Sequence, residues 1–191
     1  RSYEITASVE GTRTSLEGVD LGGRPIDALG IFSGTKFVNA KFTTKDDNAA
    51  SATFTGDATD AEGTEAAKAF AYYPYAAGAT LEGTTVSGLE IPAVQTFAEG
   101  TFATTLNPMA AVGEDHTSLA FRSVGAVLRF KLTGTDTFNK LILTGNNDES
   151  IAGAYALDFS GEVPAMTFSG EGKSITVTCA SDVTLKTDVA T

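Results

Sequence analysis

Apolar and polar residues alternate along most of the chain with a period of two, which is the spacing of a β-strand. Residues 3–9, "YEITASV", carry the apolar side chains Tyr3, Ile5, Ala7 and Val9 on one face. Similar segments recur about every ten residues and are bounded by Gly, Pro or Asn. This pattern predicts an all-β chain folded as an antiparallel β-sandwich.

One segment has a helical pattern. In residues 56–70, "GDATDAEGTEAAKAF", either Asp60 or Thr64 is suited to cap a turn that runs through Glu65–Lys68. The segment is short and alternation resumes directly after it. We therefore expect at most one or two short helical turns in the whole chain.

The longest apolar stretch is "SLAFRSVGAVLRFKLTG", residues 118–134. Its apolar positions are odd at Leu119 and Phe121, and even from Val124 to Leu132. A change of phase at Arg122–Gly125 indicates a β-bulge or a break between two strands, because one more residue turns every side chain to the other face.

Three of the five tyrosines lie in "AFAYYPYAAG", residues 69–78. Alternation places Phe70 and Tyr72 on one face and Tyr73 on the other, so both faces are predicted to be covered. Pro74 has no N–H to donate, and the hydrogen-bond ladder should stop there. We expect Tyr72 and Tyr73 to be buried on opposite sides of one strand, rather than exposed as a flat platform for sugar rings.

Domain boundaries are weakly marked. Residues 160–166, "SGEVPAM", are the best candidate for a seam. We assign residues 1–160 to an N-terminal β-sandwich. Residues 161–191 are either the start of a second β domain or the final strands of the same sandwich.

The net charge of −11 and the pI near 4.4 argue against a nucleic-acid partner, which requires a cationic surface. The same charge repels anionic lipid headgroups, and no apolar run is long enough for a membrane helix. Cys179 is the only cysteine, so no disulfide forms within the chain. In "SITVTC" it shares a face with Ile175 and Val177, which predicts a buried thiol.

Candidate chemistry is sparse. His116, the only histidine, lies in "GEDHTS", which predicts a surface loop rather than a site. The segment 145–153, "GNNDESIAG", gathers oxygen ligands, but a hairpin connection is the simpler interpretation. The acidic loops at Asp46–Asp47 and at Asp57, Asp60 and Glu62 are interpreted as solvated. We expect no catalytic residue, cofactor or metal, and a chain that is not an enzyme.

Five segments, in this order and spacing, resemble the fimbrillin-like proteins of Bacteroidales, which include subunits and anchors of type V pili. They are "TASVEGTRTSLEG", "AFAYYPYAAGATLEGTTVSGLEIPAVQTFAEGTF", "NPMAAV", "LAFRSVGAVLRFKLTG" and "KLILTGNNDESIAGAYALDFSGE". The similarity spans nearly the whole chain. It implies a transthyretin-like β-sandwich, export as a lipoprotein with its lipid anchor upstream of Arg1, and a place in a fimbrium or on the outer membrane at the cell surface.

The resemblance also implies assembly by β-strand exchange with other fimbrillin subunits, and contact with a receptor on a host or bacterial surface. Cleavage at an arginine would free the first strand, and a strand from another subunit would fill the groove. In this sequence Arg13 is the arginine placed for cleavage, and Tyr3, Ile5, Ala7 and Val9 belong to the displaceable strand. A buried Arg13, or a first strand central in a sheet and inseparable from the core, would count against this assignment.

Two other functions compete with a fimbrial or adhesion subunit. One is a secreted carbohydrate-binding module with a tyrosine platform and calcium in the acidic loops. The other is a hydrolase with paired carboxylates, for which the sequence alone does not place any two acids facing each other in a groove.

Overall fold

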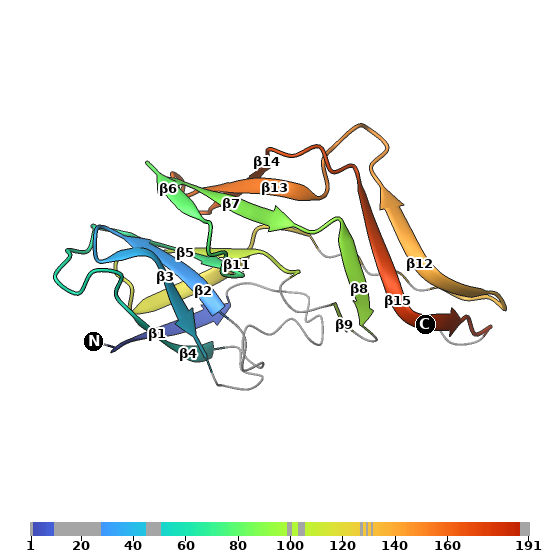
Figure 1. The fold of residues 1–191 in the computed structure, drawn as a ribbon, viewed down its shortest axis with the longest axis horizontal. Coiled ribbons are helices and arrows are strands. Elements are labelled where there is room, and N and C mark those ends of the chain that lie inside the picture. Colours follow the sequence, from blue (N-terminus) through green and yellow to red (C-terminus); the bar gives the residue numbers. More distant parts are fainter. Residues whose placement is uncertain are drawn as a thin grey trace.

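The computed structural model describes residues 2–9, 28–44, 51–98, 101–102, 106–126, 128, 130 and 132–187. Every helix or strand in these ranges is a β-strand, which confirms the prediction of an all-β chain. The strands form a closed barrel and two four-stranded sheets. Figure 1 shows an elongated molecule with the barrel at one end and the sheet of β8, β9, β12 and β15 at the other.

The barrel has seven strands in the closed order β1-β11-β10-β5-β2-β3-β4. Its strands are β1 (Ser2–Val9), β2 (Ala28–Ser33), β3 (Phe37–Thr43), β4 (Ser51–Asp57), β5 (Ala69–Tyr73), β10 (Met109–Gly113) and β11 (Ser118–Ser123). All neighbours are antiparallel except β1 and β11, which run parallel. The first expectation was an antiparallel sandwich, whereas these strands close into a barrel with one parallel contact.

Two seams of this barrel are thinly paired. β3 and β4 are joined in two register pairs, and so are β10 and β11. By contrast, β1 and β4 are joined in seven. The two seams separate a group of three strands, β4-β1-β11, from a group of four, β10-β5-β2-β3.

The two remaining sheets share a continuous stretch of chain. The first has the order β14-β13-β7-β6 and the second has the order β12-β15-β8-β9. Their strands are β6 (Thr80–Glu82), β7 (Thr85–Ile91), β13 (Gly153–Asp158) and β14 (Ala165–Phe168), then β8 (Val94–Ala98), β9 (Thr101–Phe102), β12 (Thr137–Thr144) and β15 (Ser174–Thr184). β7 ends just before Pro92, and β8 then enters the second sheet (Figure 1). β14 pairs with β13, and β15 lies between β12 and β8.

The buried apolar residues form two clusters, and the second of them joins the barrel to the β14-β13-β7-β6 sheet. The first fills the barrel and includes Ile5, Phe42 and Phe54. The second lies between the outer face of β2, β5 and β10 and the inner face of the neighbouring sheet, where Tyr72 meets Tyr155 and other residues of β7 and β13. Strands β2, β5 and β10 are therefore covered on both faces, which is why they read as nearly continuous apolar runs.

The predicted helical turn at Glu65–Lys68 is wrong. Asp60 does accept a bond from the Glu62 N–H (3.0 Å), but it caps only a turn that closes through the Gly63 N–H. The chain beyond this turn lies against the β2–β3 connection, where the Thr35 N–H donates to Thr64 O at 2.9 Å. Bonds to another segment take the place of the bonds within a helix.

The change of phase in residues 118–134 marks the end of a strand. β11 ends at Ser123, and the described residues from Val124 to Leu132 are outside any strand. Leu128 is 61% exposed and Phe130 is 47% exposed, so this half of the apolar stretch does not form the buried strand that its alternation predicted.

Candidate functional site

The first strand is central in the barrel. β1 pairs antiparallel with β4 from Ser2 to Ser8, and parallel with β11 from Thr6 to Val9. The Thr6 N–H also donates to Thr117 O at 2.9 Å, just before β11 begins. β1 is therefore bonded along both of its edges over its C-terminal half, as a strand in the middle of a sheet is.

The side chains of β1 alternate as predicted. Ile5 and Ala7 are buried in the barrel, Tyr3 is half-buried against the same cluster, and Glu4 and Thr6 are exposed. The backbone of Val9 pairs with Phe121, while its side chain lies outside the described part of the chain. The strand thus supplies an apolar row to the barrel interior and a polar row to the surface.

The central position of β1 counts against its loss without a replacement, because loss would expose two strand edges and an apolar row at once. Arg13 lies outside the described residues, so its exposure is not part of the structure.

Tyr3 sits among side chains from separate segments. Its ring is edge-on to Phe37 at the start of β3, with ring centroids 5.3 Å apart. The His116 ring is also edge-on, at 5.6 Å, and the Lys36 ammonium lies 5.6 Å from the centroid of the tyrosine ring. The Glu65 carboxylate bonds to two of these groups, His116 and Lys36.

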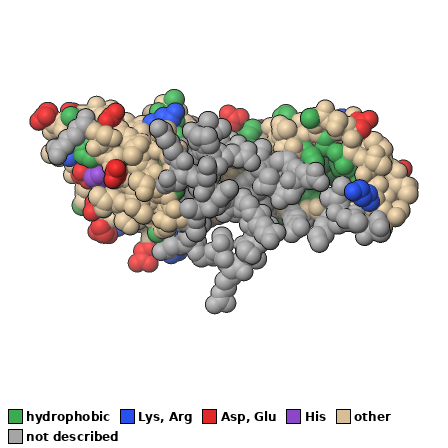
Figure 2. All heavy atoms as spheres, turned by 90° about the horizontal axis from the view of Figure 1, so that it is seen from below, with side chains coloured by type: hydrophobic (Ala, Val, Ile, Leu, Met, Phe, Trp, Pro, Cys, Tyr) green, Lys and Arg blue, Asp and Glu red, His purple; other side chains and the backbone are tan. Residues whose placement is uncertain are grey.

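His116 is not a surface residue, contrary to the sequence-based prediction. It lies in the turn between β10 and β11, and its side chain is almost fully buried. Its Nδ1–H donates to Glu65 Oε2 at 2.7 Å, and the Lys36 Nζ donates to Glu65 Oε1 at 3.4 Å. Figure 2 shows the histidine in purple at the barrel end of the molecule, close to acidic side chains.

The sequence gives no local signal for this cluster. Lys36 belongs to the β2–β3 turn, Glu65 to the loop after β4, and His116 to the β10–β11 turn. Only closure of the barrel brings these three connections to the end of β1 where Tyr3 lies.

The tyrosine segment is a buried strand. Tyr72 and Tyr73 are 0% and 6% exposed, and they belong to the outer and inner apolar clusters respectively. β5 ends at Tyr73, just before Pro74, and the Tyr75 N–H then bonds to Ala28 O. All three predictions for this segment are confirmed.

The Tyr72 hydroxyl is anchored inside the molecule. It donates to Asn39 Oδ1 at 2.6 Å and accepts from the Ala76 N–H at 3.3 Å. Burial raises the pKa of Tyr72 above its usual range, so the phenol stays protonated. Since neither Tyr72 nor Tyr73 is exposed, these two rings do not form a sugar platform.

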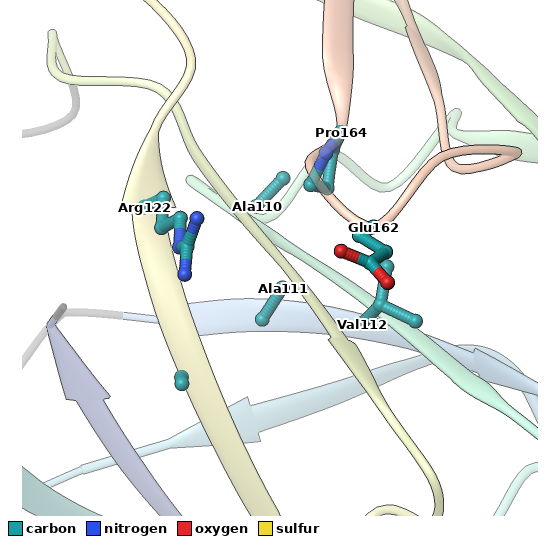
Figure 3. A pocket seen from close by; sticks show the side chains of 7 residues that line it. Ala110, Ala111, Val112, Arg122, Glu162 and Pro164 are labelled. Atoms are coloured by element: carbon teal, nitrogen blue, oxygen red, sulfur yellow. The ribbon is translucent and has the colours of Figure 1, made fainter.

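A cavity of about 230 Å³ lies at the thin seam between β10 and β11. Arg122 of β11 and Glu162 of the β13–β14 connection reach toward it from opposite sides, as Figure 3 shows. Its floor is formed by small residues of β10 such as Ala110 and Ala111. The described atoms leave space for several water molecules between the two strands.

The acidic loops hold no cluster of three metal-binding side chains in the described ranges. Asp46–Asp47 lies outside those ranges. The segment 145–153 is not a hairpin connection, because β12 and β13 belong to different sheets. Within it Asp148 forms an ion pair with Lys173, and the Asn147 N–H donates to a Glu149 carboxylate oxygen at 2.7 Å.

One face of the β12-β15-β8-β9 sheet is apolar and only partly covered. Leu141 pairs with Val177 and Leu143 pairs with Ile175, so these side chains share a face, and all four are half-buried. Cys179 lies on the same face and is also half-buried, not buried as predicted. No residue of β12 or β15, both fully described, is buried. Hydrophobic atoms gather at this end of the molecule in Figure 2.

The described residues contain no helix of the length and apolarity needed to cross a membrane. Comparison of the chain with protein-family models, with curated proteins and with solved structures gives no match.

Proposed function

We propose that this chain is a fimbrillin-like subunit of a surface fibre or adhesion assembly, and that it binds other subunits by exchange of β1. The single observation behind the proposal is the two-edged groove that β1 fills between β4 and β11. This central position is the outcome named above as counting against a displaceable β1, and it restricts the proposal to exchange, in which another strand replaces β1. The family resemblance described above supplies the biological setting: export to the cell surface, a fimbrium or an outer-membrane anchor, and other fimbrillin subunits as partners.

The geometry around β1 favours exchange over simple strand addition. If β1 left, β4 would keep two register pairs with β3, and β11 would keep two with β10. The groove would then have two free strand edges and an apolar floor, which is a strong acceptor for an extended chain. A replacement strand would restore both ladders, whereas addition at an outer edge restores one.

The groove also sets the direction and pattern of the incoming strand. It must run antiparallel to β4 and parallel to β11, as β1 does. At the Ile5 position there is space for a large aliphatic side chain, and at Ala7 for a small one, because both side chains are completely enclosed. An incoming strand with bulky residues at both positions would overpack the core.

The transthyretin-like sandwich belongs to the same proposal. The two thin seams divide the barrel into β4-β1-β11 and β10-β5-β2-β3, two antiparallel or mixed groups with one apolar cluster between them. Such an arrangement corresponds to a sandwich whose two sheets touch at both margins. β1 is then the middle strand of the three-stranded sheet.

Cleavage at Arg13 tests the proposal. The intact chain is treated with an Arg-specific protease, and its products are followed by native mass spectrometry. We expect the fragment that contains β1 to stay bound at first and then to be replaced, with formation of a ladder of oligomers.

The variant Arg13→Lys is the control, because it keeps the charge and removes the cleavage site. Its products should contain no fragment that ends at residue 13 and should form no ladder of oligomers, whatever cleavage occurs at the other arginines, Arg1, Arg24, Arg122 and Arg129. A cleaved chain that stays monomeric at every protein concentration, with β1 permanently bound, would contradict assembly by strand exchange.

A further inference from the structure

We propose that the groove of β1 ends in an aromatic-selective subsite, so that any strand that takes the place of β1 carries an aromatic ring where Tyr3 now lies. The identity of this partner strand rests on the proposed function. The subsite itself rests on contacts present in the intact chain, formed by Lys36, Phe37 and His116 around Tyr3.

The contacts with Tyr3 are directional. Phe37 meets the tyrosine ring at an interplanar angle of 86°, and His116 meets it at 80°. Edge-to-face contacts of this kind arise from the quadrupole of the aromatic ring, and an aliphatic side chain of equal area cannot form them. Phe37 and His116 also contact one another, with centroids 4.7 Å apart, so the two walls support each other.

The third contact is a cation. Lys36 Nζ lies over the ring of Tyr3, where an ammonium group is attracted to the negative face of an aromatic ring. This contact is lost if the ring is replaced by leucine or isoleucine.

Glu65 holds two walls of the subsite, His116 and Lys36, in place. One of its carboxylate oxygens receives the His116 Nδ1–H, and the other receives the Lys36 ammonium. A single carboxylate therefore fixes both the imidazole plane and the position of the cation. Glu65 is a positioning residue for the subsite.

The remainder of the groove has a different preference. Ile5 lies in the barrel interior, where the surrounding side chains are aliphatic or aromatic and completely close over it. The acceptor therefore selects the pattern aromatic, any residue, large aliphatic, any residue, small, which β1 satisfies with Tyr3, Ile5 and Ala7. Register follows from the ring, because a slip by two residues would place isoleucine among the aromatic walls.

The first test uses the full chain after cleavage at Arg13. Fluorescent peptides of residues 2–9 compete for the groove: the native sequence, a variant with Tyr3→Phe, and a variant with Tyr3→Leu. We expect the native and phenylalanine peptides to bind with similar affinity and the leucine peptide to bind about tenfold more weakly. Equal binding of the leucine and native peptides would overturn the aromatic subsite while leaving strand exchange intact.

The second test does not need exchange. Amide hydrogen exchange of β1 is measured in the uncleaved chain for the same two substitutions. In the Tyr3→Phe variant, the backbone amides of β1 should be as protected as in the native chain. In the Tyr3→Leu variant, the amides in the N-terminal half of β1 should exchange about tenfold faster. If no peptide enters the cleaved protein, the proposed function fails, and the hydrogen-exchange result alone decides the subsite.

The variant Glu65→Gln tests the positioning role. It should reduce the preference for the native over the leucine peptide, because the walls are no longer held, whereas a merely structural role would weaken both peptides equally. If the affinities of both peptides fall equally, Glu65 has no role in positioning the walls of the subsite.

Discussion

Tyr72 fills a space that the neighbouring strand leaves open at Gly30. The two residues are register partners, and a Cβ added at Gly30 would lie 2.3 Å from the tyrosine ring. This contact fixes the ring above β2, where its hydroxyl reaches Asn39. The glycine is thus required by a side chain and not by a turn.

We expect Gly30→Ala to lower the free energy of unfolding by about 1–3 kcal/mol, since Tyr72 must leave its rotamer. Urea unfolding at neutral pH measures this change. Gly78→Ala is the matched control, because nothing lies within 4 Å of its added Cβ, and it should change stability by less than about 0.5 kcal/mol. An unchanged midpoint for Gly30→Ala would show that the ring is free to move.

Tyr155 makes stability depend on alkaline pH. Burial raises the pKa of its phenol to about 12, whereas the unfolded phenol titrates near 10. Above pH ~10 the unfolded chain loses a proton that the folded chain keeps, so stability falls as the pH rises from about 10 to 12. Tyr72 acts in the same direction.

Tyr155→Phe should therefore reduce the loss of stability between pH 8 and 11, as measured by urea unfolding at both pH values. Tyr75→Phe removes a hydroxyl outside the two apolar clusters and serves as the comparison. The same loss for Tyr155→Phe as for the native chain would assign the pH dependence to other groups.

Strand positions were predictable from the alternation of β1 and from the two-sided pattern of β5, because each is a local property of a few residues. Strand pairing was not. The parallel contact of β1 with β11 joins residues more than a hundred positions apart, and nothing in "YEITASV" distinguishes a parallel from an antiparallel neighbour.

The same limit explains the errors in the loops. Asn and Gly in residues 145–153 suit a hairpin, but they equally suit a crossing between two sheets, where Asp148 takes a positive φ of 67°. His116 was assigned to the surface because Glu114 and Asp115 flank it, yet its side chain turns inward to Glu65. The aromatic neighbours of Tyr3 are brought to it only by closure of the barrel, so the local sequence pattern does not predict them.

At the scale of elements, the partly covered face of β12 and β15 should bind a hydrophobic dye. We expect fluorescence of 8-anilinonaphthalene-1-sulfonate with the native chain, and a clear decrease in Leu141→Thr, which removes apolar area from this face. Ile142→Thr is the matched control, because the adjacent side chain points to the opposite face. An equal decrease for both variants would place the dye elsewhere.

For the whole molecule, the net charge of −11 opposes contact between copies. Assembly of cleaved chains should therefore be slower at 10 mM salt than at 150 mM. The Debye length falls from about 30 Å to about 8 Å between these two salt concentrations, so the repulsion between chains is screened at the higher one. Light scattering at a series of salt concentrations measures the rate. Faster assembly at low salt would indicate a partner of opposite charge.

The parallel contact that closes the barrel should also form late in folding, because it joins residues more than a hundred positions apart. β1 pairs with β4, which lies about fifty residues later in the chain. The second edge of β1 is paired only when β11 is present, where Thr6 lies opposite Ser118. During synthesis, which begins at the N-terminus, β1 can therefore pair with β4 along one edge only until the β10–β11 hairpin has formed, because contacts so distant in sequence form late. During that interval the edge of β1 that later faces β11 is open to solvent, to chaperones and to other chains.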